Sequence, residues 1–222
     1  MGGEQRILGI DLALNHSGFV LINEQGEMID FHYITTRKGA YNVAPDISTY
    51  YKPPNSKDTD VKGLVRLNFM AEFICGELWD KMRPTIASLE GYAFDTHGAH
   101  QMGELNGYVR LHTYRSKTKL RIHDPLSVKM YSAHKGNAKK HEVVQAVRDR
   151  WGVDFSRYNG SKADATVEED LSDAMALAQM GLTEYKLRNG LSLMSDYAPK
   201  EIQVFNRVTK RAPLNILARE WI

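Results

Sequence analysis

Four acidic residues occupy positions where a chain seldom places charge. Asp11 interrupts the apolar run 6–13, and Glu90 ends the strand-like segment IASLE. Asp170 and Asp173 lie three residues apart in a helical pattern, so their side chains project from one face. Carboxylates buried near each other are very costly unless a cation neutralises them, and all-oxygen ligands suit Mg²⁺ or Mn²⁺. The set is therefore a candidate site for two ions about 4 Å apart, which could activate a water and stabilise the leaving 3′ oxygen of a phosphodiester.

Individual members of this set have simpler explanations. Asp170 could answer the dipole at a helix N-terminus, which favours acidic residues, and Asp11 could cap a turn. The spacing of the four acids along the chain does not show that they meet in space. The metal-site hypothesis therefore depends on a fold that brings them together.

Other site chemistries find little support in the sequence. The histidines form no His-Glu-x-x-His pattern, there is no Cys-x-x-Cys pair, and Cys75 is the single cysteine, so we expect no zinc site and no internal disulfide. The segment GNAK at 136–139 lacks the glycine spacing and the Ser/Thr of a phosphate-binding loop. We therefore expect no nucleotide cofactor.

The charge of the chain is unevenly distributed. Eleven lysines and arginines but three acidic residues lie between Arg110 and Arg150, although the formal net charge of the whole chain is +2. A basic segment in an otherwise acidic chain is typical of polyanion binding. The segment indicates contact with nucleic-acid phosphates, with an ordinary solvated charged surface as the alternative.

The apolar pattern predicts an α/β fold with a mixed sheet flanked by helices. Strand-like segments at 6–13, 17–23 and 27–34 have short links, which indicate an antiparallel meander. Residues 37–60 are polar and without a sustained period, so we expect an insertion loop there. The remaining segments alternate, with helices at 61–82, 103–116, 139–151 and 166–187 and strands at 85–94 and 119–124.

Four segments together resemble the RuvC-type Holliday junction resolvases of the RNase H-like superfamily. LGIDLALNHSGFVLI is similar to the family's opening strand motif and PTIASLEGYAF to its second. PLSVKMYSAHKGNAKKHEVVQAV resembles the lysine-bearing segment, and EEDLSDAMALA the closing Asp-x-x-Asp-Ala helix. The resemblance implies an RNase H-like domain at 1–185 with a five-stranded mixed sheet, followed by a basic C-terminal extension at 186–222. The 37–60 segment and the tail are longer than in the bacterial enzyme, which would suit a phage or organellar relative.

The family's functional residues carry over position by position. The four acids become the ligands of two Mg²⁺ ions, for which Mn²⁺ would substitute. Lys129 and Lys140 match lysines that contact or polarise the scissile phosphate, which makes Lys140 a catalytic residue beside the acids. The family's aromatic wedge falls on Ala93 here, so we expect Tyr92 or Phe94 to stack on an unpaired base, unless both are core residues. The basic segment supplies the further expected DNA contacts, which are Lys135, Lys139, Arg115, Lys117 and Lys119.

The resemblance implies a structure-selective DNA endonuclease that resolves four-way junctions, cutting symmetric strands as a homodimer. The apolar helix face from Leu64 to Leu78 is a candidate dimer interface. Two alternatives stay open: a nuclease of the same fold acting on flaps, RNA–DNA hybrids or transposon ends, and a non-catalytic nucleic-acid- or nucleotide-binding protein. The polar N-terminus and the absence of long apolar runs predict no secretion and no membrane span. We expect the protein in the cytoplasm, or in the organelle or host-cell compartment that holds the DNA.

Overall fold

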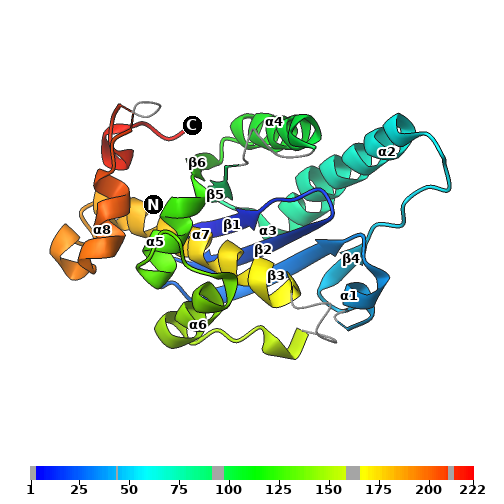
Figure 1. Cartoon of the computed structure of the whole chain (residues 1–222). Coiled ribbons are helices and arrows are strands. Elements are labelled where there is room, and N and C mark those ends of the chain that lie inside the picture. Colours follow the sequence, from blue (N-terminus) through cyan, green and yellow to red (C-terminus); the bar gives the residue numbers. More distant parts are fainter. Residues whose placement is uncertain (1–3, 44, 92–97, 159–165, 210–212) are drawn as a thin grey trace.

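A six-stranded mixed sheet forms the centre of the protein, in the order β4-β3-β2-β1-β5-β6 (Figure 1). The computed structural model describes residues 4–43, 45–91, 98–158, 166–209 and 213–222. Strands β1, β2 and β3 are antiparallel neighbours, whereas β4 is parallel to β3, and β5 and β6 continue parallel to β1. The strands are β1 (Arg6–Asp11), β2 (His16–Asn23), β3 (Met28–Thr35), β4 (Ser48–Tyr50), β5 (Ile86–Glu90) and β6 (Lys119–His123).

The sheet confirms the predicted α/β class and the antiparallel-then-parallel arrangement, but the expected count of five strands was wrong. The sixth strand is β4, which lies inside the segment predicted to be a loop. The same segment also contains the short helix α1 (Lys38–Val43). A strand of three residues is too short to show a period, and β4 exists because β3 offers it a free edge.

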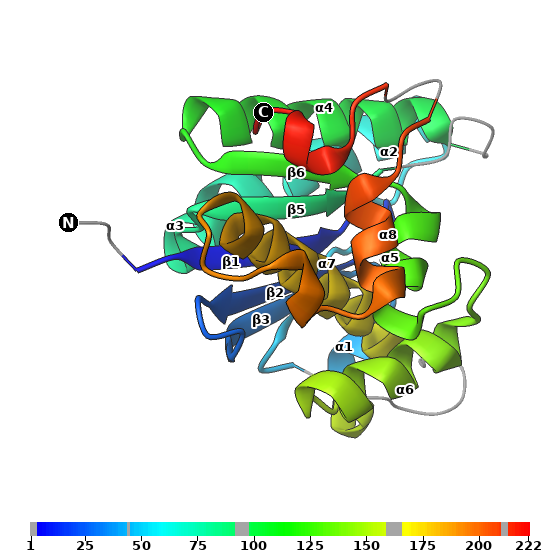
Figure 2. The ribbon, with the colours of Figure 1, turned by 90° about the vertical axis from the view of Figure 1, so that its left-hand side faces the viewer.

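Helices cover both faces of this sheet, and Figure 2 shows α7 crossing the nearer face. One core lies between the sheet and α2 (Thr59–Glu72), the π-helical turn Phe73–Leu78, α3 (Trp79–Met82) and α4 (Ala99–Arg115). The second core lies between the other face and α6 (Lys140–Trp151) and α7 (Thr166–Arg188). Among the described helices, none combines the length and the apolar character needed to cross a membrane.

Helix α7 is buried on most sides and lies in direct backbone contact with the sheet. A Cβ atom added at Gly9 would lie 1.9 Å from the carbonyl oxygen of Ala174, and one at Gly18 would lie 2.6 Å from that of Asp170. Any side chain at these glycines would push the helix outward. The two glycines therefore determine how closely the start of α7 approaches β1 and β2.

The C-terminal residues pack on the same domain. Helix α8 (Pro199–Asn206) joins α5 (Pro125–Ala133) and α7 in a third apolar cluster. Ile222 exchanges two backbone hydrogen bonds with Leu120, so the end of the chain covers the outer edge of β6 (Figure 2). Beneath it, Arg121 and Glu184 form a fully buried ion pair with a 2.6 Å contact. The proposed extension from residue 186 thus begins inside α7 and continues over β6.

The close approach at Gly9 generates a stability prediction. Gly9→Ala should destabilise the protein by about 1–3 kcal/mol or more, because the methyl group collides with backbone that cannot rotate away. Thermal unfolding measures this at roughly 2–4 °C per kcal/mol. Gly107→Ala is the matched control. Gly107 is an exposed residue of α4, and a Cβ atom added there would have no other atom within 4 Å. That control should gain up to about 1 kcal/mol. Equal melting temperatures for Gly9→Ala and the wild type would contradict the close contact.

Candidate active site

Two of the four acids end neighbouring parallel strands. Asp11 is the last residue of β1 and Glu90 the last residue of β5. The register pairs Ile10 with Leu89, so the next residue of each strand is one of the acids. Asp11 and Glu90 therefore lie side by side at the carboxyl ends of their strands. In open α/β sheets this edge is where ligands bind, because side chains from several strands meet there.

The start of α7 brings the other two acids to the same place. The Asp170 backbone rests on Gly18, the register partner of Asp11. Burial raises the pKa of Asp11 well above its usual range, and the charges of Asp170, Glu90 and Asp173 raise it further. The structure thus brings together all four acids that the sequence singled out.

Burial and neighbouring negative charges destabilise the ionised forms of Asp11, Glu90 and Asp173. Burial, followed by the charge of Glu90, raises the pKa of Asp173 to about 7. Burial also raises the pKa of Glu90, although a hydrogen bond with the Asp11 side chain opposes the shift. Such a cluster has to bind either protons or cations near neutral pH. Its donor set, carboxylate oxygens alone, fits a hard divalent cation such as Mg²⁺.

The carboxyl groups are not preset as a closed coordination shell. In the described part of the chain, no three Asp, Glu, His or Cys side chains are grouped closely enough to hold one ion as they stand. Coulomb repulsion acts over longer distances than metal coordination. Neighbouring acids can therefore raise each other's pKa values although their oxygens are too far apart to bind one ion. A bound cation would have to draw these side chains inward.

Asp170 differs from the other acids because two protein side chains already contact one of its oxygens. His16 Nδ1 lies 2.6 Å from Asp170 Oδ2, and the Tyr33 hydroxyl donates a 3.1 Å hydrogen bond to the same oxygen. His16 begins β2 and Tyr33 lies on β3, where its side chain is fully buried. Sequence reasoning missed both residues. The clue for His16 was its place in the loop between Asp11 and the glycine at position 18.

A buried histidine also escaped the sequence analysis. His123 ends β6 and is the register partner of Glu90. Neither of its ring nitrogens has a hydrogen-bond partner among the described residues, and burial lowers its pKa to about 3. Its imidazole is therefore neutral. The charges that act on it are those of Arg121, Asp124 and Arg219, and not those of the four acids. No local pattern marks this residue, because its burial depends on the elements packed over β6.

Two lysines lie beside the acids, as the resemblance implied. Lys140, the first residue of α6, places its Nζ 3.2 Å from Glu169 Oε2 and 3.6 Å from Asp170 Oδ1. Burial would lower its pKa, but the charges of Asp170 and Glu169 outweigh that effect and raise it. Lys129, on α5, lies close enough to the cluster for its charge to lower the pKa values of Glu90 and Asp173.

Other predicted DNA-binding residues are more dispersed. Lys139 is exposed and precedes α6, and Lys135 forms a 3.0 Å ion pair with Glu142. Arg115, Lys117 and Lys119 lie at the end of α4 and the start of β6, at the opposite end of the sheet from Glu90. They cannot contact the same phosphate as Lys140. The remaining predictions, Tyr92 and Phe94, lie outside the described residues.

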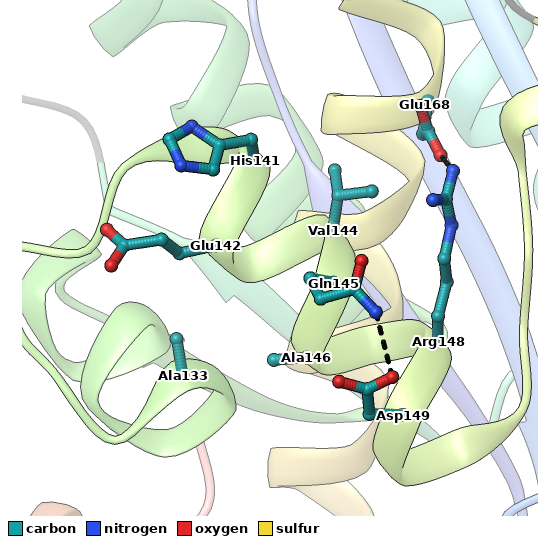
Figure 3. Close-up of a pocket in the computed structure, with 9 residues that line it drawn as sticks. All are labelled: Ala133, His141, Glu142, Val144, Gln145, Ala146, Arg148, Asp149 and Glu168. Atoms are coloured by element: carbon teal, nitrogen blue, oxygen red, sulfur yellow. Dashed lines mark hydrogen bonds and ion pairs between the residues drawn. The ribbon is translucent and has the colours of Figure 1, made fainter.

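The surface hollow in Figure 3 is separate from this cluster. It lies along α6, with Ala133 from α5 and Glu168 from α7 at its margin. None of the four acids lines it. Several of its polar side chains already have protein partners, since Arg148 pairs with Glu168 and Gln145 donates to Asp149. We therefore assign the candidate chemistry to the carboxyl ends of β1 and β5.

Comparisons with known proteins reveal structural relatives. The chain matches no protein-family profile and no curated protein sequence. Its structure resembles Thermus thermophilus RuvC, with 19% identity and a TM-score of 0.54 over 84% of this chain and 97% of that one. The same enzyme in complex with a Holliday junction substrate gives 19% identity and 0.55, over 82% and 93%. The yeast mitochondrial Holliday junction resolvase Ydc2 gives 18% and 0.52, over 82% of each chain. These similarities confirm that the chain has the fold of these resolvases.

The raised pKa of Asp173 predicts how stability changes with pH when no metal is present. The folded state keeps a proton that the unfolded chain releases, so stability should fall as pH rises from about 4 to about 7 and stay low above that. Asp173→Asn removes this loss. In EDTA the variant should melt several degrees higher than the wild type near pH 8 and similarly near pH 4.

Two further measurements sharpen this test. Added Mg²⁺ should stabilise the wild type more than Asp173→Asn, because the variant lacks one candidate ligand. Asp149→Asn, at an exposed acid on α6, should leave the pH profile unchanged. If the melting temperatures of Asp173→Asn and the wild type changed with pH in the same way, the raised pKa of Asp173 would be contradicted.

Proposed function

We propose that this protein is a structure-selective DNA endonuclease that resolves four-way junctions. One observation supports this most: four acids and two lysines gather at the carboxyl ends of β1 and β5, on the fold shared with junction resolvases. Acidic clusters of this composition suit Mg²⁺-dependent phosphodiester cleavage. A structural relative solved with a Holliday junction substrate makes branched DNA the first substrate to test.

The four acids would hold Mg²⁺, or Mn²⁺ in its place. Two such ions, when bound, supply an activated water and a counter-charge for the leaving oxygen. The chain's own residues would prepare the site. His16 and Tyr33 contact Oδ2 of Asp170, whereas Oδ1 lies 3.6 Å from Lys140 Nζ. An acid held in this way loses little conformational freedom on binding a cation.

Lys140 and Lys129 would receive the scissile phosphate. Both reach the acids from the α5–α6 side, so a phosphate placed between them and the carboxyl groups would meet positive charge on one flank. Positive groups fixed where negative charge develops lower the barrier to phosphoryl transfer. Exposed Lys139 would extend this contact along the DNA backbone, and stacking by Tyr92 or Phe94 at the junction centre stays part of the proposal.

Symmetric cleavage of a four-way junction requires two copies of the site, which we propose are provided by a homodimer. The interface first expected, Leu64 to Leu78, needs correction, because Ile74 and Leu78 are buried in the core of the subunit. Large apolar side chains on the outer faces of adjacent α2 and α4 are exposed instead: Val61, Leu64, Val65, Tyr108, Leu111 and Tyr114. Exposed apolar surface of this kind is typical of interaction sites.

Removing one candidate metal ligand tests the proposed reaction. Asp11→Asn should bind a four-way junction with nearly wild-type affinity and cut it at least about a hundredfold more slowly with Mg²⁺, since each 1.36 kcal/mol of lost transition-state stabilisation is tenfold in rate. Asp149→Asn serves as the matched control and should cut normally. Parallel assays on a flap and an RNA–DNA hybrid test the substrate class. Wild-type cleavage by Asp11→Asn would exclude this site, and preference for the flap or hybrid would exclude the junction.

The proposed interface predicts a change of oligomeric state. The wild type should have about twice the 25.2 kDa mass of the chain in light scattering. Leu64→Asp should shift the protein towards the monomer and uncouple the two cuts, because a charge would be buried in the contact. Leu191→Asp is the control, since Leu191 is 62% exposed against 68% for Leu64 but lies beyond α7. A wild-type monomer that resolves junctions symmetrically would contradict the dimer.

A further inference from the structure

The 36–62 segment, which comprises residues 36–58 and the first turn of α2, lies at the same end of the sheet as the acidic cluster. Thr36 N–H donates to the carbonyl of Asn15, in the loop that follows Asp11, and Tyr51 N–H donates to the carbonyl of Thr35 at the end of β3. The segment then leads into α2, which Asp58 caps. In Figure 1 it occupies the right-hand side, with the start of α7 between it and α5. It therefore flanks the candidate site.

Packing gives this segment a defined shape. Strand β4 pairs with β3 through three residues, and His32 Nε2 lies 2.9 Å from the Thr49 hydroxyl. Tyr51 is buried and its ring lies 5.0 Å from that of Phe69 on α2, while Ala40 of α1 is buried in the core beneath α7. A partner would meet a preformed surface, so binding would cost little ordering entropy.

The exposed face of the segment carries free positive charge. Five exposed basic side chains of this segment make no ion pair with any described residue, and these are Arg37, Lys38, Lys52, Lys57 and Lys62. Three acids accompany them, Asp46, Asp58 and Asp60, and the Asp58 carboxylate accepts two hydrogen bonds from the backbone of α2. The balance on this surface is positive.

The basic segment between Arg110 and Arg150 is more neutralised than its composition implied. Five of its basic residues are in ion pairs with acids of the same chain: Arg121, Lys135, Lys140, Arg148 and Arg150. Four others, from Arg110 to Lys119, belong to the last turns of α4 and the start of β6, towards the far end of the sheet. Much of the unpaired positive charge at the site end therefore lies on the 36–62 side.

We propose that residues 36–62 bind the phosphate backbone of a second duplex arm of the branched substrate, an inference that rests on the proposed function. Helix α5, with Lys129, follows β6 at one edge of the sheet, whereas this segment is built on β4 at the other edge. Arms diverging from a junction seated over the acids would then meet basic side chains on both flanks. Phosphate contacts need exposed charge and carry no base specificity.

Neutralising this surface tests the inference. A triple variant, Lys38→Ala/Lys52→Ala/Lys57→Ala, lies outside the proposed dimer interface and is made with Asp11→Asn so that the DNA stays uncut. It should bind a four-way junction about ten- to hundredfold more weakly near 150 mM salt. The slope of log affinity against log salt should flatten by about one for each lost phosphate contact. Affinity for a linear duplex of one arm's length should fall much less, because that duplex can occupy the Lys129 flank alone.

The control removes charge at the other end of the molecule. Lys186→Ala/Lys200→Ala changes the last turns of α7 and the first turn of α8, far from β4 in Figure 1, and should leave affinity and slope unchanged. Wild-type binding by the triple variant, or an equal loss in the control, would overturn the arm-binding surface while leaving the resolvase proposal intact. If Asp11→Asn without the lysine substitutions bound the junction no more tightly than the linear duplex, the proposed function would be refuted, and this inference with it.

Discussion

The crowding of four carboxyl groups at the carboxyl ends of β1 and β5 is the constraint on which the rest of the structure depends. It exists because α7 rests directly on β1 and β2 at Gly9 and Gly18, with no side chain in between. That contact places the first turns of the helix over the carboxyl ends of β1 and β5. The crowded acids therefore lower the stability of the fold locally, unless protons or cations bind to them. This happens at the place where the proposed chemistry requires a cation.

Apolar packing and a buried ion pair stabilise the remainder of α7. Its middle turns are surrounded by apolar side chains of the sheet, α5 and α6. Near its C-terminus, Glu184 is fully buried and pairs with Arg121 of β6 and Arg188 of the same helix. Both arginines also donate to the carbonyl of Arg219, so the end of the chain is tied to the same ion pair. A helix held this firmly at one end can keep repelling acids in position at the other.

Charge is divided in the same way, between groups that stabilise the fold and groups left available. Arginines deep in the structure pair with acids, and the paired lysine Lys140 lies at the acidic cluster. The unpaired lysines of the 36–62 segment face outward at the site end. His16 and Tyr33 link the two regions, because Tyr33 pairs with β4 and also donates to Asp170. The same inserted strand therefore supports both a candidate ligand and the proposed arm-binding surface.

The sequence by itself determined the order of the main elements and the identity of the four acids, because both are written in local patterns. An acid ending an apolar strand, or two acids three residues apart on a helix, can be recognised without any knowledge of distant residues. Only the tertiary structure decided that these acids meet, that His16 and Tyr33 join them at Asp170, and that β4 adds a sixth strand. It also decided which basic residues are neutralised and which are free, as Arg121 and Lys52 illustrate. Ion pairing, burial and edge pairing arise between residues distant in the chain, and no local pattern of residue types records those distances.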